Sequence, residues 1–91
     1  MSNPQSLTIE LRNAKGLHAR AAAKFVKTCE MYKAEVEVSK GGLTVSALSI
    51  MGLMMLGARF GSHIDITAAG PEAGQALKAI EHLINQRFGE G

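Results

Sequence analysis

Cysteine, tryptophan and tyrosine are scarce in this chain, whose 91 residues include one cysteine, Cys29, one tyrosine and no tryptophan. A single cysteine excludes an intrachain disulfide and is typical of a protein from a reducing cytosol. Few aromatic rings also leave the chain without the stacking platforms on which single-stranded nucleic acids bind. We therefore expect a cytoplasmic protein that binds no nucleic acid.

Long apolar runs and a strong excess of one charge are missing as well. The longest apolar stretch, residues 50–56, is too short to span a bilayer, and residues 1–6 lack the apolar core of a signal peptide. The formal net charge is only +2, and the basic residues are spread along the chain. These features predict no membrane partner.

The length of 91 residues leaves room for one small domain, residues 1–91. A domain of this size buries a limited share of its surface and cannot easily enclose a deep substrate cleft. The length therefore favours a carrier, a binding module or a regulator over a self-sufficient enzyme.

Hydrophobic periodicity predicts the order of the elements. Alternating apolar residues indicate strands around residues 7–11, 35–39, 43–45 and 64–67. Helical spacing indicates helices from residue 18 to about residue 32, from Ser49 as N-cap to about Leu56, and from Gly70-Pro71-Glu72 onward. Turns are expected at residues 13–16 and at Gly41-Gly42.

Each predicted strand has one apolar and one polar face, so one face of the sheet must be covered by the helices. The expected fold is an α+β open-faced sandwich in the order βαββαβα. Its four-stranded, mainly antiparallel sheet would carry three helices on one face.

His18 lies where the first turn meets the first helix, in the run Lys15-Gly16-Leu17-His18-Ala19-Arg20. A helix start offers unpaired backbone N–H groups, here those of Ala19 and Arg20, to an anion. The Arg20 guanidinium suits phosphate oxygens, and a neutral imidazole nitrogen can form a bond to phosphorus. The alternative is that His18 is only a polar capping residue, and neither composition nor spacing decides between the two.

Two motifs resemble one known family. Gly16-Leu17-His18-Ala19-Arg20 is similar to the active-site signature of HPr, the histidine-containing phosphocarrier of the bacterial sugar phosphotransferase system. Residues 48–54 resemble the second HPr signature, around its regulatory serine, at the family's usual separation. The resemblance extends from about residue 6 to residue 88. One departure is Ala21, where the family usually has a proline that would stiffen the first helical turn.

The resemblance implies a role for each residue and partner. His18 would accept a phosphoryl group through ring Nδ1 from enzyme I, which phosphoenolpyruvate charges, and would pass it to enzyme IIA proteins. Arg20 would stabilise the phosphate. Ser49 would be a regulatory phosphorylation site for an HPr kinase/phosphorylase, besides being a helix cap. The chain would be a covalent carrier and not an enzyme, with no cofactor.

The helix after Ser49 is apolar nearly all round. Leu53 and Leu56 share one face, while Ile50, Met51 and Met54 lie on another. A Met-rich stripe is usually core, but this chain is too small to cover both faces. We expect Ile50, Met51 and Met54 to form an exposed docking surface for enzyme I and enzyme IIA.

Other readings of the chain remain open. A regulatory HPr paralogue of nitrogen or carbon control would keep His18 and act mainly through protein binding. A small α/β metabolite- or RNA-binding module would need aromatic platforms or a basic face. His63 and His82 have no partners at ligand spacing, so no metal site is expected.

Overall fold

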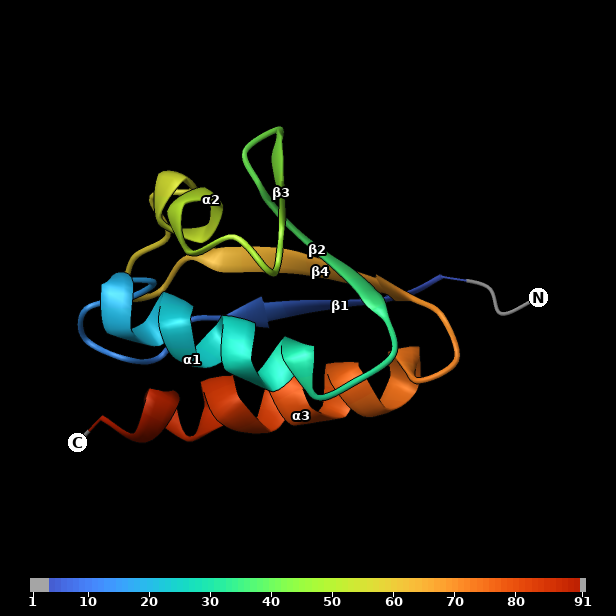
Figure 1. Ribbon diagram of the computed structural model, residues 1–91. Helices are drawn as coiled ribbons and strands as arrows, with labels where there is room; N and C mark the ends of the chain where they lie inside the picture. Colours follow the sequence, from blue (N-terminus) through green and yellow to red (C-terminus); the bar gives the residue numbers. More distant parts are fainter. Residues whose placement is uncertain (1–3, 91) are drawn as a thin grey trace.

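The computed structural model describes residues 4–90, and its elements follow the predicted order (Figure 1). They are β1 (Gln5–Glu10), α1 (Ala19–Glu30), β2 (Glu35–Lys40), β3 (Leu43–Ser46), α2 (Ile50–Met55), β4 (His63–Ala69), α3 (Ala73–Asn85) and a short 3-10 helix, η1 (Arg87–Gly89). No helix within residues 4–90 is long and apolar enough to cross a membrane.

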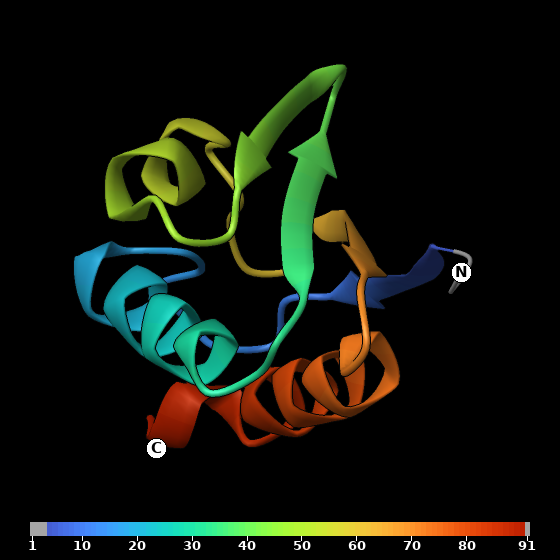
Figure 2. The same cartoon turned by 45° about the vertical axis from the view of Figure 1, so that its right-hand side comes forward.

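The four strands form one sheet in the order β1-β4-β2-β3, with every neighbouring pair antiparallel. The β2–β3 pair is a tight hairpin, because Lys40 lies opposite Leu43 and only Gly41 and Gly42 connect them. Both glycines have positive φ, 57° and 86°, as such a turn requires. Figure 2 shows this hairpin extending away from α1 and α3.

Strict alternation along the strands directs one face of the sheet into the core. In β2, Val36 and Val38 are buried while Glu35 and Glu37 are exposed. Helices α1 and α3 lie side by side under the buried face (Figure 1). The predicted α+β open-faced sandwich is confirmed.

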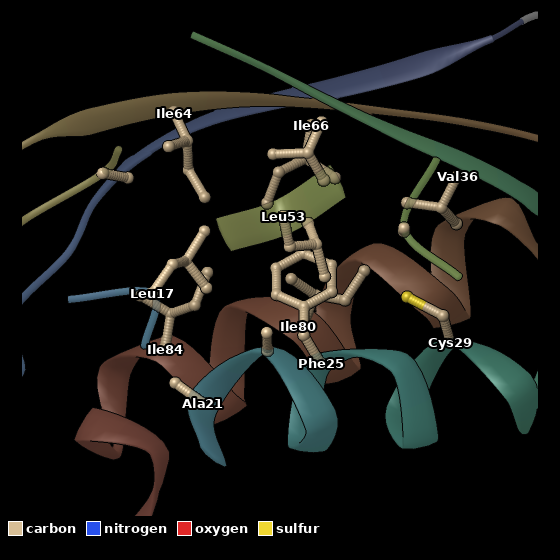
Figure 3. Close-up of a cluster of buried hydrophobic side chains, with 14 of the residues drawn as sticks. Leu17, Ala21, Phe25, Cys29, Val36, Leu53, Ile64, Ile66, Ile80 and Ile84 are labelled. Atoms are coloured by element: carbon tan, nitrogen blue, oxygen red, sulfur yellow. The ribbon is translucent and has the colours of Figure 1, made fainter. Parts of the chain in front are cut away.

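The core brings the helices and the sheet together through fully buried side chains (Figure 3). Phe25 of α1, Leu53 of α2, Ile66 of β4 and Ile80 of α3 are each 0% exposed. Full burial of a side chain of this size contributes about 1.5–3 kcal/mol. The core therefore fixes α1 against the sheet, and with it the position of the residues that precede α1.

Two helix boundaries differ from the prediction. Helix α1 ends at Glu30 and not near Tyr32, because the chain turns toward β2 and the Ala34 N–H donates to the Tyr32 carbonyl at 3.0 Å. Helix α3 begins at Ala73, after the predicted opening. Its N-cap residue, Glu72, donates its N–H to the carbonyl of Lys33 at 3.0 Å, and Lys33 lies in the loop between α1 and β2.

Candidate functional site

The loop before α1 is held close to the segment after α2. Gly16 has a φ of +61°, and a Cβ there would lie 2.4 Å from the Ala58 carbonyl oxygen. The next residue, Leu17, is buried and donates its N–H to the same oxygen at 3.0 Å. Only glycine allows both the backbone conformation and this close approach. The position of His18, one residue further, is thereby fixed.

His18 is the N-cap residue of α1, but its side chain caps no backbone N–H. The imidazole is 27% exposed, and its Nε2 makes a hydrogen bond and ion pair with the Glu90 carboxylate. Within residues 4–90, ring Nδ1 makes no hydrogen bond. The side chain is therefore not a helix cap, and one ring nitrogen remains free for chemistry.

The start of α1 is open to solvent beside His18. The Ala22 N–H is bonded to the His18 carbonyl at 2.9 Å, so the N–H groups before it have no partner in the helical ladder. Ala19 and Arg20, which carry two of these groups, are both exposed. The only ion pair among residues 4–90 is that of His18, so the Arg20 guanidinium is available to an external anion.

A shallow cavity of about 530 Å³ joins these groups. Its lining consists of Ala14, Lys15, His18, Ala19, Arg20 and Glu90. The cavity thus places two basic side chains, a helix N-terminus and a free imidazole nitrogen next to one another. This arrangement suits a tetrahedral oxyanion such as a phosphoryl group.

Glu90 is the site residue that the sequence did not reveal. It lies 72 positions from His18, beyond the last apolar residue of the helical pattern, and no motif marks it. The hydrogen bond from His18 lowers the pKa of the Glu90 carboxyl. Partial desolvation opposes this shift, while a hydrogen bond from Asn13 and the charge of Lys15 reinforce it.

Ser49 is the N-cap of α2, as predicted. Its hydroxyl oxygen accepts a hydrogen bond from the Gly52 N–H at 2.9 Å, and its carbonyl accepts from the Leu53 N–H at 3.0 Å. Ser49 does not line the His18 cavity. The two predicted modification sites, His18 and Ser49, are the N-cap residues of two different helices, α1 and α2.

The two faces of α2 have the predicted exposure. Leu53 and Leu56 are buried, whereas Ile50, Met51 and Met54 are 40%, 72% and 43% exposed. The neighbouring Leu48 and Met55, which the sequence analysis did not include, are exposed as well. We call these five exposed residues, Leu48, Ile50, Met51, Met54 and Met55, the α2 patch. Figures 1 and 2 both show α2 beside the start of α1.

The remaining candidates have ordinary surroundings. Cys29 is buried in the core, and burial raises the pKa of its thiol to about 12. His63 and His82 are exposed. Within residues 4–90, no group of three or more His, Cys, Asp or Glu side chains is arranged to hold a metal ion.

Comparison with known proteins gives one consistent family. The family model described as "PTS HPr component phosphorylation site" matches residues 5–86. The phosphocarrier protein HPr of Neisseria meningitidis is 46% identical over 84 residues, which are 92% of this chain and 94% of that protein. The phosphocarrier protein HPr of Pseudomonas aeruginosa is 42% identical over 87 residues, 94% of this chain and 97% of that protein.

The fold agrees with the sequence match. A crystal structure of HPr-C-His from Thermoanaerobacter tengcongensis superimposes with a TM-score of 0.91 at 41% identity, covering 96% of this chain and 98% of that chain. The family model covers both the loop that carries His18 and the α2 patch. The chain belongs to the HPr family, the phosphocarrier proteins of the phosphotransferase system.

Proposed function

We propose that this chain carries a phosphoryl group on Nδ1 of His18, accepting it from enzyme I and delivering it to enzyme IIA proteins. The observation that carries the proposal is the arrangement of the imidazole. Its Nε2 is engaged by Glu90, while Nδ1 is free beside the open end of α1 and the exposed Arg20. A neutral ring nitrogen with a free lone pair is a nucleophile near neutral pH.

The phosphate would be held by backbone and side-chain groups at the start of α1. The N–H groups of Ala19 and Arg20 and the positive end of the α1 dipole favour an anion at this point. Arg20 adds a guanidinium whose fork matches phosphate oxygens. Since the site is a shallow, partly exposed cavity, the partner protein completes it and excludes water during transfer.

The α2 patch is the proposed docking surface for enzyme I and enzyme IIA. Its side chains are large, flexible and apolar, and they adjoin the start of α1, where the transfer takes place. Contiguous exposed apolar side chains on a small protein are typical of a protein–protein interface.

Ser49 is proposed as a regulatory site for an HPr kinase/phosphorylase. A phosphate on its hydroxyl would stand at the N-terminus of α2, where negative charge is compatible with the helix dipole. The same charge would lie at the border of the α2 patch and would have to be desolvated when a partner docks. The chain is proposed to act in the cytoplasm, without a cofactor, as a covalent carrier.

The proposal is tested with enzyme I and labelled phosphoenolpyruvate. We expect one acid-labile, base-stable phosphate on the wild-type chain, mapped to the peptide that contains His18. His18→Ala should accept no label, and the matched control His82→Ala, which changes an exposed histidine on α3, should accept it at the wild-type rate. Labelling of His18→Ala at the wild-type rate would show that the phosphoryl acceptor is another residue.

A further inference from the structure

The last described residues form a turn that is unusual for its sequence. Arg87 and Phe88 have φ values of 55° and 54°, followed by Gly89 at 74°. Residues with a Cβ rarely adopt this left-handed backbone conformation, so such a turn is stable only where contacts with the surrounding structure hold it. The Phe88 side chain is buried in the core, and Lys24 Nζ of α1 donates to the Phe88 carbonyl at 2.5 Å. The C-terminal turn is thus fixed to α1.

The turn brings Glu90 to the start of α1, where its carboxylate contacts the His18 ring. Its N–H donates to the Arg87 carbonyl at 2.9 Å. One carboxylate oxygen accepts from His18 Nε2, and the other accepts from Asn13 Nδ2 at 3.2 Å. Asn13 Nδ2 also donates to the Gly16 carbonyl at 2.7 Å. Glu90 therefore connects the loop before α1 to the C-terminal turn.

We propose that Glu90 is a positioning residue for phosphoryl transfer, an inference that rests on the proposed role of His18. A carboxylate that accepts from Nε2–H selects the tautomer in which Nδ1 holds the lone pair. It also restricts rotation of the ring, so that Nδ1 stays directed into the cavity. A neutral imidazole in the other tautomer would present a protonated Nδ1 that cannot attack phosphorus.

The contact also matches the charge that develops during transfer. When Nδ1 forms its bond to phosphorus, the bond between phosphorus and the donor breaks, and its electron pair stays with the donor. The ring keeps its proton on Nε2 and gains positive charge. The Glu90 carboxylate lies against that proton, so it stabilises the charged ring more than the neutral one.

Glu90 is ionised under the conditions in which transfer would occur. The hydrogen bond from His18 lowers the pKa of its carboxyl, and the basic side chains of Lys15 and Arg20 line the same cavity. Because folding lowers the pKa of the Glu90 carboxyl, its contact with His18 is present at pH values above the ordinary pKa of a carboxyl group. The contact is lost as the pH falls through the lowered pKa. The side chains of His18 and Glu90 are 27% and 23% exposed, so solvent weakens the ion pair between them.

The opposite role is also testable. Glu90 could act as a negative charge that repels the incoming phosphoryl group and slows transfer. The geometry favours positioning, because the carboxylate contacts Nε2 and leaves Nδ1 open. A variant without the carboxylate distinguishes the two roles by the direction in which the rate changes.

The experiment measures the initial rate of enzyme I-dependent phosphorylation of Glu90→Ala and Glu90→Gln. Glu90→Ala should be slower by about 3–10-fold, less than the tenfold or more that a buried hydrogen bond to a charged group provides, because the pair is partly exposed. Glu90→Gln keeps an oxygen that can accept from Nε2–H and should recover part of the rate. Glu81→Ala, an exposed glutamate of α3, is the matched control and should behave as wild type.

A second readout separates positioning from a merely structural role. In the ¹⁵N spectrum of labelled histidine, the share of neutral His18 rings protonated at Nε2 should fall in Glu90→Ala, while the melting temperature stays unchanged. A Glu90→Ala rate at or above wild type, or an unchanged tautomer share, would overturn the inference even with His18 phosphorylated. Labelling of His18→Ala would overturn the proposed function instead.

Discussion

Gly16→Ala tests whether the close contact between the loop before α1 and the segment after α2 holds His18 in place. The new Cβ would lie 2.4 Å from the Ala58 carbonyl oxygen and 2.7 Å from the Arg59 Cα. Both atoms belong to the backbone, so the loop and the segment must separate by about 1 Å to restore ordinary contact. That separation weakens the hydrogen bond from the Leu17 N–H to the Ala58 carbonyl.

The loss of stability caused by the Gly16 contact is obtained by comparing Gly16→Ala with a matched control, Gly41→Ala. Gly41 has a φ of +57°, close to the +61° of Gly16, but a Cβ at Gly41 would meet nothing within 4 Å. Gly41→Ala therefore carries only the cost of a left-handed alanine, about 1–2 kcal/mol. Gly16→Ala adds about 1–3 kcal/mol for overpacking and about 1 kcal/mol for the weakened hydrogen bond. The effect of alanine on the unfolded chain is the same in both variants and cancels in the comparison.

Urea denaturation of the two variants measures the difference. We expect Gly16→Ala to lose about 2–4 kcal/mol more in the free energy of unfolding than Gly41→Ala. At a temperature where both remain folded, Gly16→Ala should also accept phosphate more slowly, since its loop is displaced. Equal losses of stability in the two variants would refute the claim that the Gly16–Ala58 contact holds the loop.

Other residues give further predictions. Arg20→Ala should slow phosphoryl transfer by about 10–100-fold, since a hydrogen bond to a charged group contributes about 1.5–3 kcal/mol, and should leave the melting temperature unchanged; an equal loss of folding would show a structural role. Met51→Glu or Met54→Glu should weaken enzyme I binding in calorimetry by about 1–3 kcal/mol without unfolding the chain, whereas unfolding would contradict their exposure. Ser49→Asp should retain the helix cap and the circular dichroism spectrum yet slow His18 phosphorylation, and a wild-type rate would leave Ser49 as a cap alone.

Much of the fold could be predicted because its determinants are local. The alternation of Val36 and Val38 with charged residues identifies β2 and its buried face, and Gly41-Gly42 fixes the hairpin that follows. Ser49 identifies the start of α2 by the chemistry of its own side chain. The exposure of Met51 could be predicted because α2 has two apolar faces and so small a chain can bury only one of them.

The parts that could not be predicted depend on contacts between distant segments. The start of α3 is set by the bond between the Glu72 N–H and the Lys33 carbonyl, on a different loop. The C-terminal turn uses left-handed backbone at Arg87 and Phe88, residue types that do not signal that conformation. Nothing in the sequence therefore placed Glu90 beside His18.

The central claim is that Nδ1 of His18 accepts the phosphoryl group, and one spectrum tests it most directly. The chain is labelled with ¹⁵N-histidine, phosphorylated by enzyme I, and examined for coupling between phosphorus and the ring nitrogens. We predict coupling to Nδ1 of His18, with the proton remaining on Nε2 beside Glu90. Coupling to Nε2, or a phosphate on any residue other than His18, would contradict the account.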